Sequence, residues 1–165
     1  MSVDPASMHK PRRFVFVLLP QFSLLAFASA LEALRLANRT AQRDVYTWAL
    51  VGEGGGSVTC SAGTTFALDV DLPETHRDDT ILLCGGLAVQ HAASARLLGW
   101  LRREARSARA VGGLCTAAQV MAQAGLLDDR RATIHWENHD SFAEEFPEVD
   151  LSKARSEEHT SELQS

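Results

Sequence analysis

The sequence predicts an α/β sandwich built on a mostly parallel sheet. Residues 14–19 and 80–84 are continuous apolar runs, which are typical of strands that are buried on both faces. Segments with helical spacing of apolar residues separate such runs, and this alternation indicates strand–helix–strand units. A length of 165 residues fits one domain, or part of one.

The first half of the chain contains two expected strands and one long helix. The run FVFVLL at residues 14–19 ends at Pro20, and Ser23 can cap a helix that continues to about residue 38. The second strand is YTWALV at residues 46–51. Residues 58–72 alternate only weakly, so we expect them to form short strands or a hairpin beside the main sheet.

The second half repeats the alternation of strands and helices. The expected strands are residues 80–84, 108–114 and 131–135, and the expected helices are residues 91–106, 117–124 and 141–146. Gly125 is the expected stop of the second of these helices. The last helix begins with Ser141 and Glu144 at capping-box spacing, and Pro147 ends it.

Cys115 occupies the sharp turn between the strand at 108–114 and the helix that follows it. This placement resembles a nucleophile elbow with cysteine in place of serine. The N-terminal end of the helix would favour the thiolate, which is the reactive form. The same local sequence also fits a small cysteine that is buried in a tight turn, and an exposed Cys115 could instead sense oxidation.

Two further features lie at the carboxyl ends of expected strands and would therefore lie near Cys115, where α/β sheets bind ligands. Gly85 and Gly86 could present backbone N–H groups to a carboxylate or an oxyanion, or could simply form a tight turn. His135 could act as a base for Cys115, or could be hydrogen-bonded under a loop. The predicted ligand site consists of Gly85, Gly86, Cys115, Thr116 and His135.

The composition argues against several classes of protein. The net charge of −5, without a long basic run, makes this part of the chain a poor candidate for direct DNA contact. Three cysteines without C-x-x-C spacing argue against a zinc ribbon or a disulfide framework and fit a cytoplasmic location. The segment HWENH at 135–139 has the wrong spacing for the zincin motif, so no metal site and no cofactor is expected. No apolar run is long enough to span a membrane.

The two ends of the chain are expected to lie outside the folded domain. Residues 1–11 form a polar arm, residues 12–154 form the domain, and residues 155–165 read RSEEHTSELQS. That last string is what one frame of a sequencing adapter encodes, so we interpret it as an assembly artefact. We therefore expect the natural protein to continue beyond Ala154.

The sequence resembles the amidotransferase-like sensor domain of AraC-type transcriptional regulators, of the ThiJ/PfpI superfamily. The resemblance covers residues 12–149, and it is most specific at 113–149, where AGLLD is followed by ATIHWEN. It implies a flavodoxin-like three-layer sandwich, here without its C-terminal strands and helix. It also implies a homodimer that binds a small metabolite such as an amino acid or a quaternary amine. DNA would be bound only through a helix-turn-helix domain that is missing here.

Enzymes of the same superfamily remain the alternative, with Cys115 and His135 as a catalytic pair for hydrolase, deglycase or glyoxalase-like chemistry. Such enzymes place an acid on the first helix against the cysteine, and alignment puts Ala26 at that position. Glu32 lies further along the helix. The loss of this acid removes a proton carrier, which favours ligand sensing over catalysis.

Overall fold

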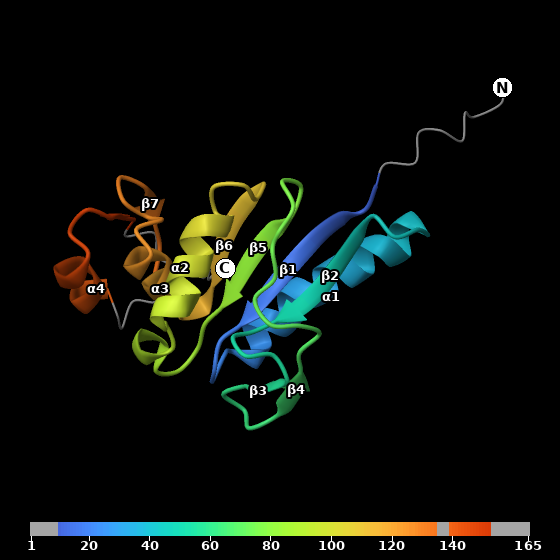
Figure 1. The fold of residues 1–165 in the computed structure, drawn as a ribbon, viewed down its shortest axis with the longest axis horizontal. Helices are drawn as coiled ribbons and strands as arrows, with labels where there is room; N and C mark the ends of the chain where they lie inside the picture. The colour runs from blue at the N-terminus through green and yellow to red at the C-terminus, as the bar shows by residue number, and fades with distance from the viewer. Residues whose placement is uncertain (1–9, 135–138, 153–165) are drawn as a thin grey trace, which may run out of the picture.

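The computed structural model describes residues 10–134 and 139–152, and it contains the expected parallel sheet. Four strands lie in the order β2-β1-β5-β6, and every neighbouring pair is parallel. Their bounds are Arg12–Leu18 for β1, Tyr46–Val51 for β2, Thr80–Cys84 for β5 and Ala110–Leu114 for β6. All four carboxyl ends therefore meet at one edge of the sheet (Figure 1).

Helices cover both faces of this sheet, which makes the three layers of a flavodoxin-like sandwich (Figure 1). Alternate residues of β1 point to opposite faces. Phe16 and Leu18 pack against α1 (Leu24–Ala41), which contributes Phe27 to the same cluster. Val15 and Val17 pack on the other face with α2 (Ala95–Glu104) and α3 (Ala118–Gln123). All four β1 side chains are at most 2% exposed, as the continuous apolar run predicts.

The expected hairpin beside the sheet is confirmed. Strands β3 (Ser57–Thr59) and β4 (Thr65–Ala67) pair antiparallel and form a separate two-stranded sheet. Phe66 from this hairpin contacts the rings of Phe22 and Phe27 edge-on, at centroid distances of 5.6 and 5.9 Å. The hairpin therefore extends the core that α1 shares with the sheet.

The expected helix at 91–106 is too long at its N-terminal end. A single 3₁₀ turn, η2 (Val89–His91), comes first, and α2 begins only at Ala95. The Ser94 hydroxyl accepts a hydrogen bond from the Leu97 N–H at 3.0 Å and so caps the helix there. The buried face of α2 carries Leu97, Trp100 and Leu101, as expected.

The C-terminal part of the described chain differs most from expectation. Strand β7 is only Arg131–Ala132, and it pairs in parallel with β8 (Asp150–Leu151) rather than with the main sheet. The Asp150 N–H donates a hydrogen bond to the Arg130 carbonyl, and the Ser152 N–H donates to the Ala132 carbonyl. These two bonds stabilise the separate sheet. Helix α4 (His139–Glu145) begins two residues before Ser141, so the capping-box prediction is wrong.

None of the helices in the described part of the chain is both long and apolar enough to cross a membrane.

Candidate functional site

Cys115 lies in a strained turn directly after β6. Its φ angle is +56°, in the left-handed region that side chains other than glycine rarely adopt. Such a conformation costs on the order of 1 kcal/mol, so the surrounding structure must hold it. The 3₁₀ turn η3 (Cys115–Ala117) leads from it into α3, and the residue is exposed. The elbow prediction is therefore confirmed in its geometry, and the buried-cysteine alternative is wrong.

Gly85 and Gly86 are required by close approaches of the backbone. A Cβ atom on Gly85 would lie 2.5 Å from the Ala117 nitrogen, and one on Gly86 would lie 2.0 Å from the Gln21 oxygen. These glycines let the end of β5 pack directly against the elbow on one side and against the loop before α1 on the other. They bring three separate segments of the chain into one site.

The backbone groups of Gly85 are already used within the protein. Its N–H donates to the Leu114 carbonyl at 3.2 Å, and its carbonyl accepts from the Ser23 N–H at 2.8 Å. The N–H of Gly85 is therefore not available to a ligand, contrary to our expectation. The carbonyl of Gly86 accepts a hydrogen bond from the Thr116 hydroxyl at 2.7 Å, which ties η3 to the segment after β5.

A cavity of about 770 Å³ opens beside these residues. This is within the usual range of small-molecule sites. Ser23 and Ser61 contribute to its wall from the side of α1 and the hairpin. The other lining residues come from the segment after β5, from the elbow and α3, and from the region of α4: Gly86, Leu87, Ala88, Val89, Gln90, Cys115, Thr116, Gln119, Ile134, Ser141 and Glu145.

Three of the five predicted ligand residues line this cavity, namely Gly86, Cys115 and Thr116. Gly85 stands behind them, in contact with Ala117, and supports the elbow. His135, the proposed base, lies outside the described residues, as does most of the HWENH segment. In the described part of the chain, no group of three or more His, Cys, Asp or Glu side chains is arranged to hold a metal ion.

Gln119 and Glu145 form a polar contact in the cavity wall that the sequence did not indicate. The Gln119 side-chain nitrogen donates to a Glu145 carboxylate oxygen at 2.8 Å. Gln119 is only 8% exposed, so its amide is fixed by packing and holds the carboxylate in place. Gln119 is four residues after Cys115, one helical turn on, and this spacing could have suggested it. No local signal pairs it with Glu145, which is 26 residues further along.

The first helix contributes no carboxylate to the cavity. Ala26 lies in the first turn of α1, where its N–H donates to the Ser23 hydroxyl at 3.3 Å. Glu32 binds Arg35 through a bidentate contact on the exposed surface, with a shortest distance of 2.6 Å. Glu145 from α4 is therefore the acid that the described residues place in the cavity wall.

The other two cysteines are core residues. Cys60 is fully buried and Cys84 is 1% exposed, both in the cluster between the sheet and α1. Burial raises the pKa of the Cys84 thiol to about 12. Neither side chain has the access that chemistry at a cavity requires, so Cys115 is distinguished from them by position.

Comparison with known protein families agrees with the observed fold. The profile of the DJ-1/PfpI family matches residues 12–152, which is most of the chain. The chain belongs to the DJ-1/PfpI family. Proteins that resemble it include two regulators of Pseudomonas aeruginosa, named HTH-type transcriptional regulators CdhR and GbdR. They are 39% identical over 140 residues and 33% identical over 148 residues.

These matches cover most of this DJ-1/PfpI chain but only part of each relative. The CdhR match spans 85% of this chain and 41% of that protein, and the GbdR match spans 90% and 40%. This chain therefore spans about two fifths of the length of these relatives. Isonitrile hydratase of Pseudomonas putida is also similar, at 34% identity over 84 residues, with half of this chain and 37% of that enzyme covered.

Solved structures confirm the fold. The structure of an AraC family transcriptional regulator from Pseudomonas putida matches with a TM-score of 0.75 and 26% identity, over 87% of this chain and 77% of that one. A ThiJ/PfpI family protein from Pseudomonas syringae matches with a TM-score of 0.71 at 18% identity, over 94% of this chain and 64% of that one. The sequence resemblance to AraC-type regulators with a ThiJ/PfpI domain is thus confirmed.

Proposed function

We propose that this chain is the ligand-sensing and dimerisation domain of an AraC-type transcriptional regulator. In the intact regulator, a helix-turn-helix domain outside this sequence would bind the operator. The similarity to the regulators CdhR, GbdR and GlxA, over 41%, 40% and 45% of their lengths, supports this assignment.

The observation that carries the proposal is the Gln119–Glu145 contact in the wall of the cavity. A carboxylate that is fixed by a buried amide offers a counter-charge to a cationic group of a ligand. The apolar atoms of Leu87, Val89 and Ile134 would contact the rest of a small molecule. We infer a ligand with a positively charged nitrogen, such as an amino acid or a quaternary amine.

The first test is thermal melting of the chain with L-arginine, glycine betaine or L-carnitine, and with succinate as an anion of similar size. A ligand whose concentration is about 100 times its Kd stabilises the folded state by about 2.7 kcal/mol. This raises Tm by about 5–10 °C in a domain of this size. We expect at least one of the cationic compounds to do so, and succinate to have no effect.

The Glu145→Gln variant supplies the specific readout, and Glu144→Gln is its matched control. Both residues are exposed on α4, but only Glu145 lines the cavity. We expect the ligand-dependent rise in Tm to disappear in Glu145→Gln and to persist in Glu144→Gln. Equal rises in both variants would place the ligand elsewhere.

The alternative function is an enzyme of the ThiJ/PfpI type, and the strained, exposed Cys115 in the cavity wall favours it. In that case Cys115 would be the nucleophile and His135 the base. Steady turnover of a small aldehyde or amide that Cys115→Ser abolishes would establish the enzyme. We expect no such turnover.

A further inference from the structure

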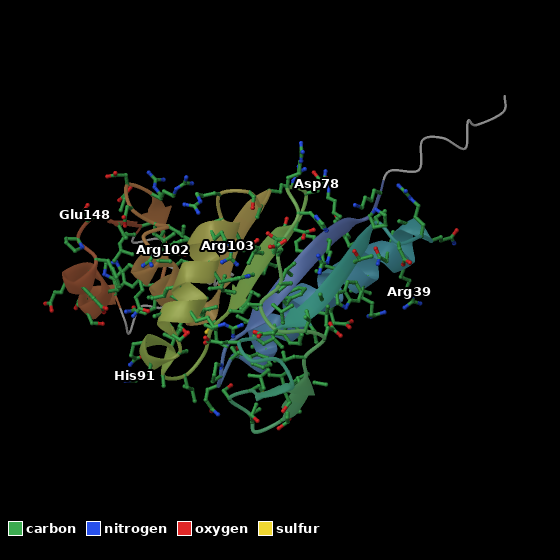
Figure 2. The ribbon with its side chains drawn as sticks, in the orientation of Figure 1. Arg39, Asp78, His91, Arg102, Arg103 and Glu148 are labelled. Atoms are coloured by element: carbon green, nitrogen blue, oxygen red, sulfur yellow. The ribbon has the colours of Figure 1, made fainter. Side chains whose placement is uncertain are left out.

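The end of the molecule opposite the cavity gathers arginines that lie far apart in the sequence. Strands β1, β2, β5 and β6 all begin there, and α1 and α2 both end there because they run back between parallel strands. Figure 2 shows Arg39 and Asp78 on the side where the strands begin, and His91 of η2 at the opposite side.

Backbone and side-chain contacts hold these strand starts together. The Arg12 N–H donates to the Val45 carbonyl at 3.0 Å, and the Arg109 N–H donates to the Asp79 carbonyl at 2.9 Å. Arg13 forms an ion pair at 3.1 Å with Asp79, which is 3% exposed. The backbone positions from which the side chains of this end project are therefore fixed.

The exposed arginines of this end, which we call the amino-end surface, are Arg12, Arg39, Arg43, Arg77, Arg106 and Arg109. Within the described residues none of the six forms an ion pair, whereas Arg13 and Arg103 are neutralised by Asp79 and Glu104. In the described segments that lead into β2 and β5, the exposed carboxylates are Asp44, Glu74 and Asp78. This end is thus locally positive in a chain whose formal net charge is −5.

We propose that the amino-end surface binds the phosphate backbone of duplex DNA. Strands are about 4.8 Å apart, so the four strand starts span about 14 Å, with a helix end on each side. A duplex presents one negative charge for about every 1.7 Å of its axis, so several arginines can meet phosphates at once. Arginine forks also suit phosphate geometry.

The choice of DNA over an acidic protein surface rests on the proposed function, since a transcriptional regulator is held next to its operator. These contacts would position the sensing domain on the DNA without reading its sequence. The composition showed no basic run because the fold assembles this surface from six positions that are separate along the chain.

The test uses the 165-residue chain and a fluorescent duplex of about 24 base pairs and arbitrary sequence, with binding followed by anisotropy across a salt series. We expect binding at low salt whose logarithmic affinity falls steeply with the logarithm of salt concentration. The triple variant Arg12→Gln, Arg77→Gln, Arg109→Gln should bind at least about tenfold more weakly. Its salt slope should be smaller by about 2.7 if each arginine meets one phosphate.

The matched control is the triple variant Arg35→Gln, Arg130→Gln, Arg131→Gln, which has the same net charge and loses exposed arginines from α1 and the region of β7. It should keep the wild-type affinity and slope, and circular dichroism checks that both variants fold. Equal losses in the two variants overturn the proposal. So does wild-type binding to poly-L-glutamate but not to the duplex. Ligand-induced stabilisation without DNA binding overturns this inference and leaves the proposed function standing.

Discussion

At the scale of single residues, the exposure of the three cysteines separates them by reactivity. Cys115 is exposed at the cavity, while Cys60 and Cys84 are at most 1% exposed. We predict that Ellman's reagent modifies one thiol per chain in the native protein and all three in denaturant. The Cys115→Ser variant should show no rapid reaction. Fast reaction of two or more thiols in the native wild type would contradict this assignment.

The strain at Cys115 leads to a second prediction at this scale. Glycine adopts a φ of +56° without steric cost, so Cys115→Gly removes the strain while it gives the unfolded chain more freedom. We expect the free energy of unfolding to stay the same or to rise by up to about 1 kcal/mol, as measured by urea denaturation. A loss of more than about 1 kcal/mol would mean that the thiol contributes packing that its exposure does not suggest.

Among the elements, the end of β5 lies close to the elbow on one side and to the loop before α1 on the other, and this explains where the cavity lies. Gly86→Ala places a Cβ atom 2.0 Å from the Gln21 oxygen, so the loop before α1 must move. We predict that the free energy of unfolding falls by several kcal/mol, as for other severe backbone clashes.

Gly99 offers the matched substitution, because a Cβ atom there would meet no other atom within 4 Å on the exposed side of α2. Gly99→Ala should stabilise by about 0.5–1 kcal/mol. Similar effects of the two substitutions in thermal melts would refute the close approach.

Glu104, the last residue of α2, makes the stability of the protein depend on pH. Burial by itself raises the pKa of Glu104, but hydrogen bonds from the Thr75 N–H and hydroxyl and from Arg103 lower it, and the net direction is downward. The stability that this carboxylate contributes is therefore complete above its unfolded pKa of about 4.5 and is lost as pH falls through the lower folded value.

The corresponding variant is Glu104→Gln, which should cost about 2 kcal/mol at pH 7 because hydrogen bonds to a charged group are lost. The difference between wild type and variant should shrink as the pH is lowered below about 4.5. Urea titrations at about pH 7 and about pH 3.5 measure it. A difference that is constant over this range would show that Glu104 is not the group that titrates.

At the scale of the whole molecule, local patterns in the sequence were sufficient for the main sheet and for the elbow. Buried strands such as β1 and β5 carry continuous apolar runs, and Gly125, with φ of +72°, stops α3 as expected. The cavity wall could not be predicted in the same way. Gln119 and Glu145 meet only through tertiary packing, and the pairing of β7 with β8 depends on two residues in each strand.

The cavity is expected to bind a small cation and to leave it chemically unchanged. Equilibrium dialysis of the chain against the cationic compound that raises Tm, followed by mass spectrometry of the recovered compound, tests both parts. We predict one molecule bound per chain and recovered unchanged, with binding lost in Glu145→Gln and kept in Glu144→Gln. Progressive consumption of the compound that stops in Cys115→Ser would contradict the claim and establish the enzyme instead.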